Sequence, residues 1–97
     1  MPKGYWIVHI EVHNLDGYKK YIEENVGAMT KYGAKYLVRG GKAERMEGDD
    51  LGSRHVVLEF KDLETARACY NSPEYQKALM LRLANSTGHL VIVEGHE

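Results

Sequence analysis

Apolar and polar side chains alternate along residues 5–12, which is the pattern of a β-strand. One face of this segment is apolar throughout, with Trp6, Val8, Ile10 and Val12. The other face is apolar at one end and ionisable at the other, with Tyr5, Ile7, His9 and Glu11. A plain core face would not carry His and Glu, and a solvent face would not carry Tyr and Ile. We therefore expect this second face to be covered and to line a cavity.

The segment Arg54–Phe60 repeats the alternation and predicts a strand of the same kind. Its apolar face carries Val56, Leu58 and Phe60, and its opposite face carries His55, Val57 and Glu59. Two more strands are expected at Lys35–Arg39 and His89–Glu94. Gly40 and Gly41 interrupt the strand that begins at Lys35, and we expect it to resume from Ala43 to Met46.

Apolar residues at helical spacing predict two helices between these strands. The first follows the N-cap residue Asn14 and ends at Gly33, with an apolar stripe of Leu15, Tyr18, Ile22, Val26 and Met29. The second begins at Asp62 and is broken at Ser72 and Pro73, which favour a new helix start. Its expected apolar side is Leu63, Ala66 and Tyr70 before the break, and Tyr75, Leu79 and Leu83 after it.

The element order is β-α-β-β-α-β, which is the ferredoxin-like α+β pattern in a single domain spanning residues 1–97. We expect a four-stranded antiparallel sheet in the order 4-1-3-2, with both helices on one face. The uncovered face would be a patch of about 400 Å² that contains Tyr, Ile and Val side chains. Such a patch is a liability in a monomer, so we predict a homodimer in which two sheets face one another.

The composition changes this picture little, but it excludes several classes of function. The net charge of −1 argues against a nucleic-acid-binding protein. A single cysteine, Cys69, rules out an intrachain disulfide and a cysteine-based zinc cluster, and we expect it to be a small buried apolar residue. No apolar run approaches the length of a membrane-spanning helix, and no signal-peptide core precedes the first strand. We expect a cytoplasmic protein without membrane or nucleic-acid partners.

Four segments carry a family resemblance: residues 3–7, residues 37–41, residues 69–76 and residues 91–95. Together they resemble a small bacterial family called domain of unknown function 1330, in the dimeric α/β-barrel superfamily. The resemblance implies a ferredoxin-like protomer that dimerises through its sheet, and it implies no agreed catalytic role. The wider superfamily includes cofactor-free monooxygenases, muconolactone isomerase-like enzymes, haem-degrading proteins and stress-response proteins.

The ionisable residues of the uncovered face are the first candidates for catalysis. His9 titrates near neutrality and could shuttle a proton, with Glu59 or His55 orienting it. The alternative is that His9 is an inert, hydrogen-bonded residue of the dimer interface. Glu11 is more simply explained as a solvated residue at a strand end.

The candidate ligand-binding residues are Arg39, Gly40, Gly41, Tyr5 and Tyr75. Arg39 could clamp an anionic group, and the two glycines would allow a ligand to approach closely. A structural salt bridge and bulge would explain the same residues, and core packing would explain Tyr75. His9, Glu11 and His13 alternate on one strand, but three such side chains hardly converge on one ion, so we predict no metal and no cofactor.

Two functions remain open from the sequence. The first is a binding protein or enzyme for a small, oxygenated, partly apolar ligand, acting by acid/base chemistry in the manner of a cofactor-free oxygenase or isomerase. The second is a homodimeric interaction or stress-response module without catalysis. Haem binding is a third and weaker alternative.

Overall fold

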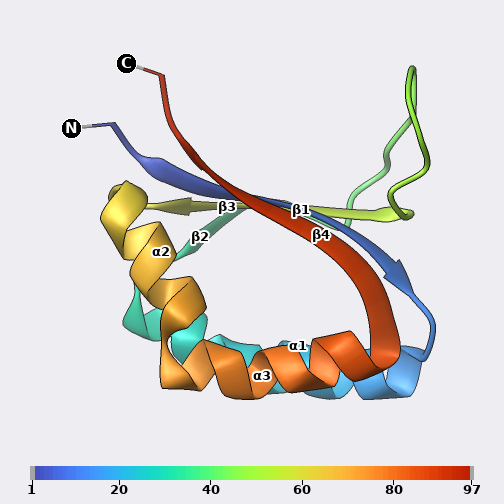
Figure 1. The fold of residues 1–97 in the computed structure, drawn as a ribbon, viewed down its shortest axis with the longest axis horizontal. Coiled ribbons are helices and arrows are strands. Elements are labelled where there is room, and N and C mark those ends of the chain that lie inside the picture. The colour runs from blue at the N-terminus through green and yellow to red at the C-terminus, as the bar shows by residue number, and fades with distance from the viewer. Residues whose placement is uncertain (1, 97) are drawn as a thin grey trace.

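Four antiparallel strands form one sheet in the computed structural model, which describes residues 2–96 (Figure 1). The strands are β1 (Gly4–Val12), β2 (Lys35–Arg39), β3 (Arg54–Phe60) and β4 (Ser86–Glu94). They lie in the order β2-β3-β1-β4, which is the predicted order 4-1-3-2 read from the opposite edge. The predicted ferredoxin-like α+β fold is therefore confirmed.

Three helices cover one face of the sheet and leave the other face open (Figure 1). They are α1 (Leu15–Lys31), α2 (Leu63–Asn71) and α3 (Pro73–Asn85). Each begins at a side-chain cap: Asn14, Asp62 and Ser72 accept hydrogen bonds from backbone N–H groups of the first turns. No helix among residues 2–96 has the length and apolar character needed to cross a membrane.

The core lies between the sheet and the helices, on the faces of β1 and β3 that the alternation predicts. Trp6, Val8, Ile10, Val56, Leu58 and Phe60 are all buried there. Trp6 lies at the centre, where its Nε1 donates a hydrogen bond of 2.9 Å to the carbonyl of Ala66 on α2. This bond satisfies the polar group of the indole, so the ring is buried at no cost in unpaired hydrogen bonds. Cys69 is also fully buried, and its burial raises the pKa of its thiol to about 12.

The predicted apolar stripes of the helices are partly wrong. Leu15 and Val26 on α1 and Leu83 on α3 are more than half exposed. The side of α1 that faces the sheet carries Tyr18, Tyr21, Asn25, Ala28 and Met29. The buried side of α1 contains the hydroxyls of two tyrosines and the amide of Asn25, so the most apolar residues of this helix do not mark its buried side.

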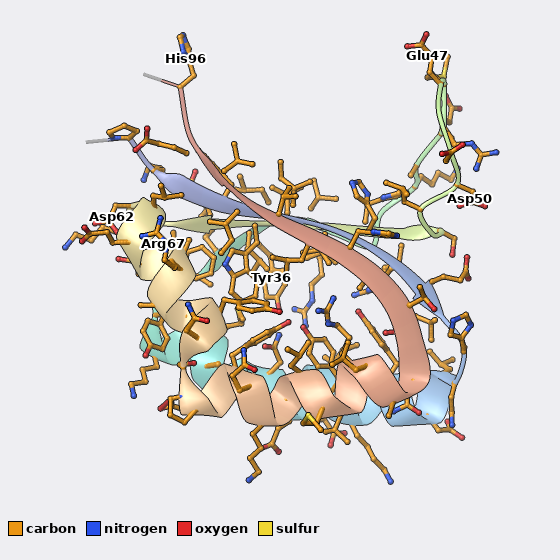
Figure 2. All side chains as sticks on the ribbon, in the orientation of Figure 1. Tyr36, Glu47, Asp50, Asp62, Arg67 and His96 are labelled. Atoms are coloured by element: carbon orange, nitrogen blue, oxygen red, sulfur yellow. The ribbon has the colours of Figure 1, made fainter. Side chains whose placement is uncertain are left out.

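The strand predicted from Ala43 to Met46 does not form. Residues 41–53 are instead an exposed loop, which rises from the sheet on the side away from the helices (Figure 1). Figure 2 shows Glu47 at the far end of this loop, whereas Tyr36 of β2 lies between the sheet and the helices. Residues 42–50 are mostly charged, so they cannot supply the apolar face that a half-buried strand requires.

Two smaller corrections concern the edge strands. The bulge expected at the glycine pair lies instead between Tyr36 and Val38, where the register with β3 shifts by one residue. Gly40 then ends the strand with a positive φ of 69°. On the opposite edge, β4 begins at Ser86, earlier than the predicted His89.

Candidate functional site

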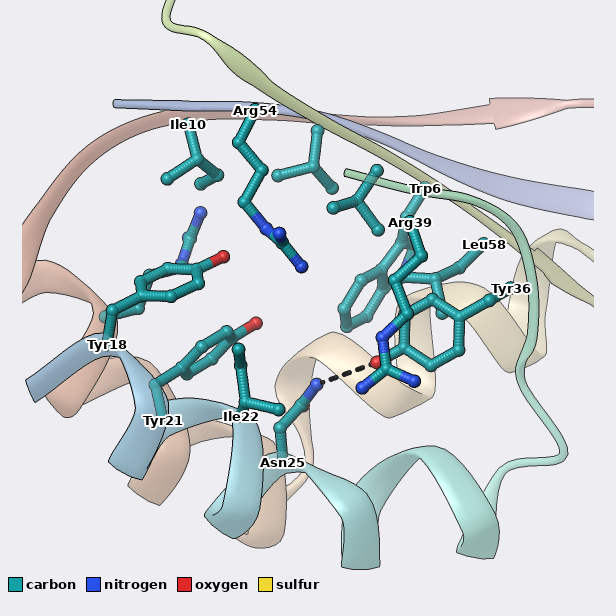
Figure 3. Close-up of a pocket in the computed structure, with 13 residues that line it drawn as sticks. Trp6, Ile10, Tyr18, Tyr21, Ile22, Asn25, Tyr36, Arg39, Arg54 and Leu58 are labelled. Atoms are coloured by element: carbon teal, nitrogen blue, oxygen red, sulfur yellow. Dashed lines mark hydrogen bonds between the residues drawn. The ribbon is translucent and has the colours of Figure 1, made fainter. Parts of the chain in front are cut away.

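A cavity lies between the inner face of the sheet and helices α1 and α3 (Figure 3). The volume of this cavity is about 30 Å³, which is room for about two water molecules. Its apolar wall consists of Trp6, Val8, Ile10, Ile22, Val56 and Leu58. Its polar wall consists of Tyr18, Tyr21, Asn25, Tyr36, Arg39, Arg54 and Arg82.

The polar wall contains three arginines and no carboxylate. Arg39 comes from β2, Arg54 from β3 and Arg82 from α3, so three separate elements direct guanidinium groups toward one space. The ion pairs found among residues 2–96 join other side chains: Lys3 with Glu59, Lys31 with Glu74, Arg45 with Asp50, and Lys77 with Glu24. The cavity therefore carries a positive charge that the described part of the chain does not neutralise.

Arg82 is the most deeply placed of the three, with only 6% of its surface exposed. Its Nε and Nη1 atoms are buried and have no hydrogen-bond partner among the described residues. The helix directs it inward because it follows Ala78 and Leu79 at helical spacing, and both of these are buried. Gly88 on β4 leaves the space that the guanidinium occupies, since a Cβ there would lie 2.9 Å from Nη1.

Arg54 and Arg39 complete the positive wall from the sheet. Arg54 lies 5.6 Å from the centre of the Tyr18 ring, and its buried Nε has no partner. Figure 3 shows its head group pointing toward the hydroxyls of Tyr18 and Tyr21. Arg39 stacks over the ring of Tyr36 at 4.2 Å from the ring centre, at the more exposed end of the cavity. The bulge in β2 makes this possible, because it brings residues three apart to the same side of the strand.

Tyrosine hydroxyls and one amide provide the remaining polar groups. Asn25 donates a weak hydrogen bond of 3.4 Å to the Tyr36 hydroxyl, while its own Oδ1 is buried without a partner (Figure 3). Burial raises the pKa of Tyr36, and it raises that of Tyr21 well above the ordinary value. These hydroxyls therefore stay protonated at neutral pH and can donate hydrogen bonds to a ligand oxygen.

The open face of the sheet holds the residues first proposed as catalytic. His9 Nδ1 and His55 Nδ1 lie 2.8 Å apart, so one ring donates a hydrogen bond to the other. The pKa of His9 is lowered, first by partial burial and then by the neighbouring His55 and His89. Near the other end of the same strands, the Tyr5 hydroxyl donates to Glu59 at 3.1 Å.

The structure does not bring the predicted site residues together. His9 and His55 pair with one another, whereas Glu59 pairs with Tyr5 four residues farther along β3. Arg39 lines the cavity on the opposite face of the sheet. Tyr75 is fully buried in the core beside Trp6, and its hydroxyl shares a hydrogen bond of 3.1 Å with that of Tyr21.

The two glycines of the predicted ligand site, Gly40 and Gly41, also have different surroundings. Gly40 donates a backbone hydrogen bond of 2.9 Å to the His55 carbonyl, and it gives Arg54 the space it occupies. Gly41 is exposed and has no atom within 4 Å of its missing Cβ. Neither glycine lines the inner cavity.

His9 and His55 line a second, more open cleft beneath the exposed loop. Its volume is about 200 Å³, and four carboxylates of the loop contribute to its wall: Glu44, Glu47, Asp49 and Asp50. Within residues 2–96, no three His, Cys, Asp or Glu side chains are arranged to hold a metal ion. His13, the third residue of the alternating set, bonds to Thr87 instead, with 2.7 Å between Nε2 and Oγ1.

Sequence reasoning missed Arg54 and Arg82, although both lie on patterns that the sequence contains. Arg54 has the same parity as Val56, Leu58 and Phe60, which places it on the inner face of its strand. Arg82 follows Tyr75, Ala78 and Leu79 at helical spacing. On β3 the predicted inner face begins at Val56, one inward position after Arg54. On α3 the predicted stripe passes through Leu83, which is exposed, instead of Arg82, which is buried.

The comparisons with known proteins agree with this fold. The family model described as domain of unknown function 1330 matches residues 3–96, and no curated protein sequence matches the chain. A crystal structure of a protein of unknown function from Rhodopseudomonas palustris aligns with a TM-score of 0.79 and 12% identity, over 99% of this chain and 84% of that one.

Two further solved structures share the fold at similarly low identity. A dimeric ferredoxin-like protein of unknown function from Jannaschia sp. CCS1 aligns with a TM-score of 0.69 and 16% identity, over 95% of this chain and 98% of that one. The cofactor-independent oxygenase SnoaB from Streptomyces nogalater aligns with a TM-score of 0.66 and 12% identity, over 100% of this chain and 96% of that one.

Proposed function

This chain belongs to the family described as domain of unknown function 1330, and we propose that it binds a small, oxygenated, partly apolar ligand in the cavity beneath its sheet. The observation that carries this proposal is the polar wall of the cavity. Core positions normally hold apolar side chains or fully paired polar ones. Here Asn25 Oδ1, Arg54 Nε and two nitrogens of Arg82 are buried without partners around one space.

The two walls of the cavity define the chemistry of the ligand. Trp6, Ile10 and Leu58 suit a carbon skeleton, and the tyrosine hydroxyls with the Asn25 amide suit oxygen atoms. Hydrogen-bond donors held in place at such a site stabilise negative charge that develops on oxygen, for example when a ketone loses a proton to form an enolate. Among residues 2–96, the cavity lining contains no carboxylate or histidine that could accept such a proton, so the proposal is binding, on a fold that is shared with the cofactor-independent oxygenase SnoaB.

A second function is favoured by a different observation, the open face of the sheet. Val91 and Val93 are 54% and 42% exposed there, and the polar groups beside them are paired with one another. An apolar surface with satisfied polar groups suits contact with a second copy of the chain. We propose that the protein is a homodimer through this face, and such a dimer leaves the cavity free.

The binding function can be tested by filling the cavity. Ile22→Phe adds a ring at a residue that lines the cavity, and Val26→Phe makes a similar addition one turn along α1, on its exposed side. Purified variants would be melted with butyrate, butyramide, benzoate and benzamide. A compound present at 100 times its dissociation constant should add about 2.7 kcal/mol of stability. We expect stabilisation of the parent and of Val26→Phe, but not of Ile22→Phe.

The same experiment can reject the proposal. If Ile22→Phe responds to every compound as strongly as the parent does, binding does not take place in the cavity. If none of the four compounds stabilises the parent, the dimeric interaction module becomes the better account of this protein.

A further inference from the structure

The cavity is positively charged as well as polar, because three arginines line it. Oxygen-bearing ligands in general need only hydroxyl and amide partners, and Tyr18, Tyr21, Tyr36 and Asn25 already provide these. Three guanidinium groups are more than a neutral ligand requires. A buried positive charge without a partner is costly, because the group has lost its hydration and gained no opposite charge.

Arg82 shows this most directly. Its surface is only 6% exposed, it lines the cavity, and its Nε and Nη1 atoms have no hydrogen-bond partner among the described residues. The chain has also left space for it, since Gly88 lacks the side chain that would collide with its Nη1. A residue kept buried, charged and unpaired is best explained by a negatively charged group that binds beside it.

We propose, on the basis of the binding function above, that the ligand is a compact carboxylic acid whose carboxylate binds at Arg82, with Arg54 on the opposite wall. A carboxylate offers two acceptor oxygens to guanidinium N–H groups, which makes a strong, charge-assisted contact. The hydroxyls of Tyr18 and Tyr21 face the same space and donate to the same oxygens (Figure 3).

The apolar wall of the cavity favours a carboxylate over an inorganic anion. The inner space has room for about two water molecules, so it admits only a compact head group. Trp6, Ile10 and Leu58 form the adjoining wall, and they provide apolar contact for the carbon skeleton. Arg39 lies at the exposed end and stays in contact with water, so it can guide an anion inward.

The test compares each acid with its neutral amide on the unmodified protein. Butyrate is set against butyramide and benzoate against benzamide, with phosphate and sulfate as inorganic anions. Trp6 is the only tryptophan of the chain and lines the cavity, so its fluorescence reports binding together with the melting temperature. We expect each acid to bind at least tenfold more tightly than its amide and more tightly than either inorganic anion.

Arg82→Met then separates this role from a structural one. In buffer without carboxylates the variant should melt at a higher temperature than the parent, because an unpaired buried charge has been removed. With benzoate present the order should reverse, because only the parent binds it. Arg67→Met removes an exposed arginine of α2 and should leave both results unchanged, while Arg82→Lys should keep part of the affinity.

Three outcomes distinguish failure of the carboxylate proposal from failure of the binding function. If the amides bind as tightly as the acids and Ile22→Phe blocks both, the carboxylate proposal fails and the binding function stands. Equal or stronger binding of phosphate or sulfate overturns the carboxylate class. If Arg82→Met keeps its response to benzoate, Arg82 is structural. The acid and amide comparison needs no variant, so it decides the matter even if Arg82→Met does not fold.

Discussion

The two faces of the sheet carry similar kinds of side chain, but they treat polar groups in opposite ways. On the open face, His9 pairs with His55, and Glu59 pairs with Tyr5 and, at 3.6 Å, with Lys3. Between the inner face and the helices, buried nitrogens of Arg54 on β3 and Arg82 on α3 have no partner among the described residues. The pairs lie on the more exposed face, and the buried arginine nitrogens of the cavity are the groups without partners.

This difference indicates what each face can contact. Paired polar groups can be covered by another protein surface without losing hydrogen bonds, which suits a permanent interface. Unpaired donors around a small cavity gain hydrogen bonds when a ligand enters, which suits reversible binding. The open face is thus expected to serve assembly, and the inner face is expected to serve recognition.

The largest effect should come from placing a charge on the open face. Ile7 lies on the central strand β1, between Val57 of β3 and Val91 of β4. Ile7→Glu would bury an unpaired carboxylate from each subunit, at a cost of about 3–5 kcal/mol, which corresponds to more than a hundredfold weaker dimer. Sedimentation should show monomers where the parent forms dimers.

The matched control is Val26→Glu, which adds the same charge to the exposed side of α1 and should leave the dimer intact. A dimer of unchanged strength in Ile7→Glu would contradict the assignment of the open face to assembly. Carboxylate binding by the monomeric Ile7→Glu protein would sharpen the comparison, because it would show that the cavity works without the interface.

An intermediate effect is expected from Gly88→Ala, which changes the inner face alone. The added methyl would lie 2.6 Å from Ile10 Cδ1 and 2.9 Å from Arg82 Nη1, so both side chains must move. Overpacking of this kind costs about 1–3 kcal/mol of unfolding free energy. Displacement of Arg82 should also weaken benzoate binding about tenfold, by the value of one charge-assisted hydrogen bond.

Urea unfolding would measure the change in stability, and Trp6 fluorescence would measure the affinity. Gly27→Ala is the control, because its added methyl meets no atom within 4 Å and its place in a helix favours alanine. That control should stabilise the protein by up to about 1 kcal/mol without changing affinity. If Gly88→Ala keeps full affinity, the position of Arg82 does not govern binding.

The sequence predicted the inner face of the sheet because two long strands alternate clearly. Trp6, Val8 and Ile10 on β1 and Val56 and Leu58 on β3 are buried as the alternation requires. The strand order and the side on which the helices pack follow instead from the β-α-β-β-α-β order of the elements, which is the ferredoxin-like pattern. Regular alternation over seven or more residues determines which face is buried, because a slip of one residue would expose the whole apolar set.

The candidate site was less predictable, because its residues depend on irregular features. A regular strand would place Tyr36 and Arg39 on opposite faces, and only the bulge after Tyr36 turns Arg39 toward the cavity. Nothing in a single sequence places a bulge there instead of at the neighbouring glycines. Arg82 lies in the last turn of α3, and the stripe predicted from apolar residues passes through its neighbour Leu83, which is exposed, so it does not identify the charged residue that points inward.

The smallest effect should be the pH dependence that His9, on the open face, gives to the free energy of unfolding. Its pKa is lowered in the folded protein, so the unfolded chain takes up a proton first as the pH falls. Stability from this group is complete above the unfolded pKa of about 6.5 and is lost as the pH falls toward the lowered, folded value. We expect a loss of less than about 1 kcal/mol between pH 7.5 and 5.5, because His9 is only partly buried.

Melting curves of the parent and of His9→Gln across this range would measure the effect. His9→Gln should flatten the slope, and an unchanged slope would show that another group is responsible. The inner face provides the contrast, because guanidinium groups stay protonated throughout this range and its affinity for benzoate should hardly change. If the affinity instead fell with the stability, the two faces would be coupled, and the division between assembly and recognition would have to be abandoned.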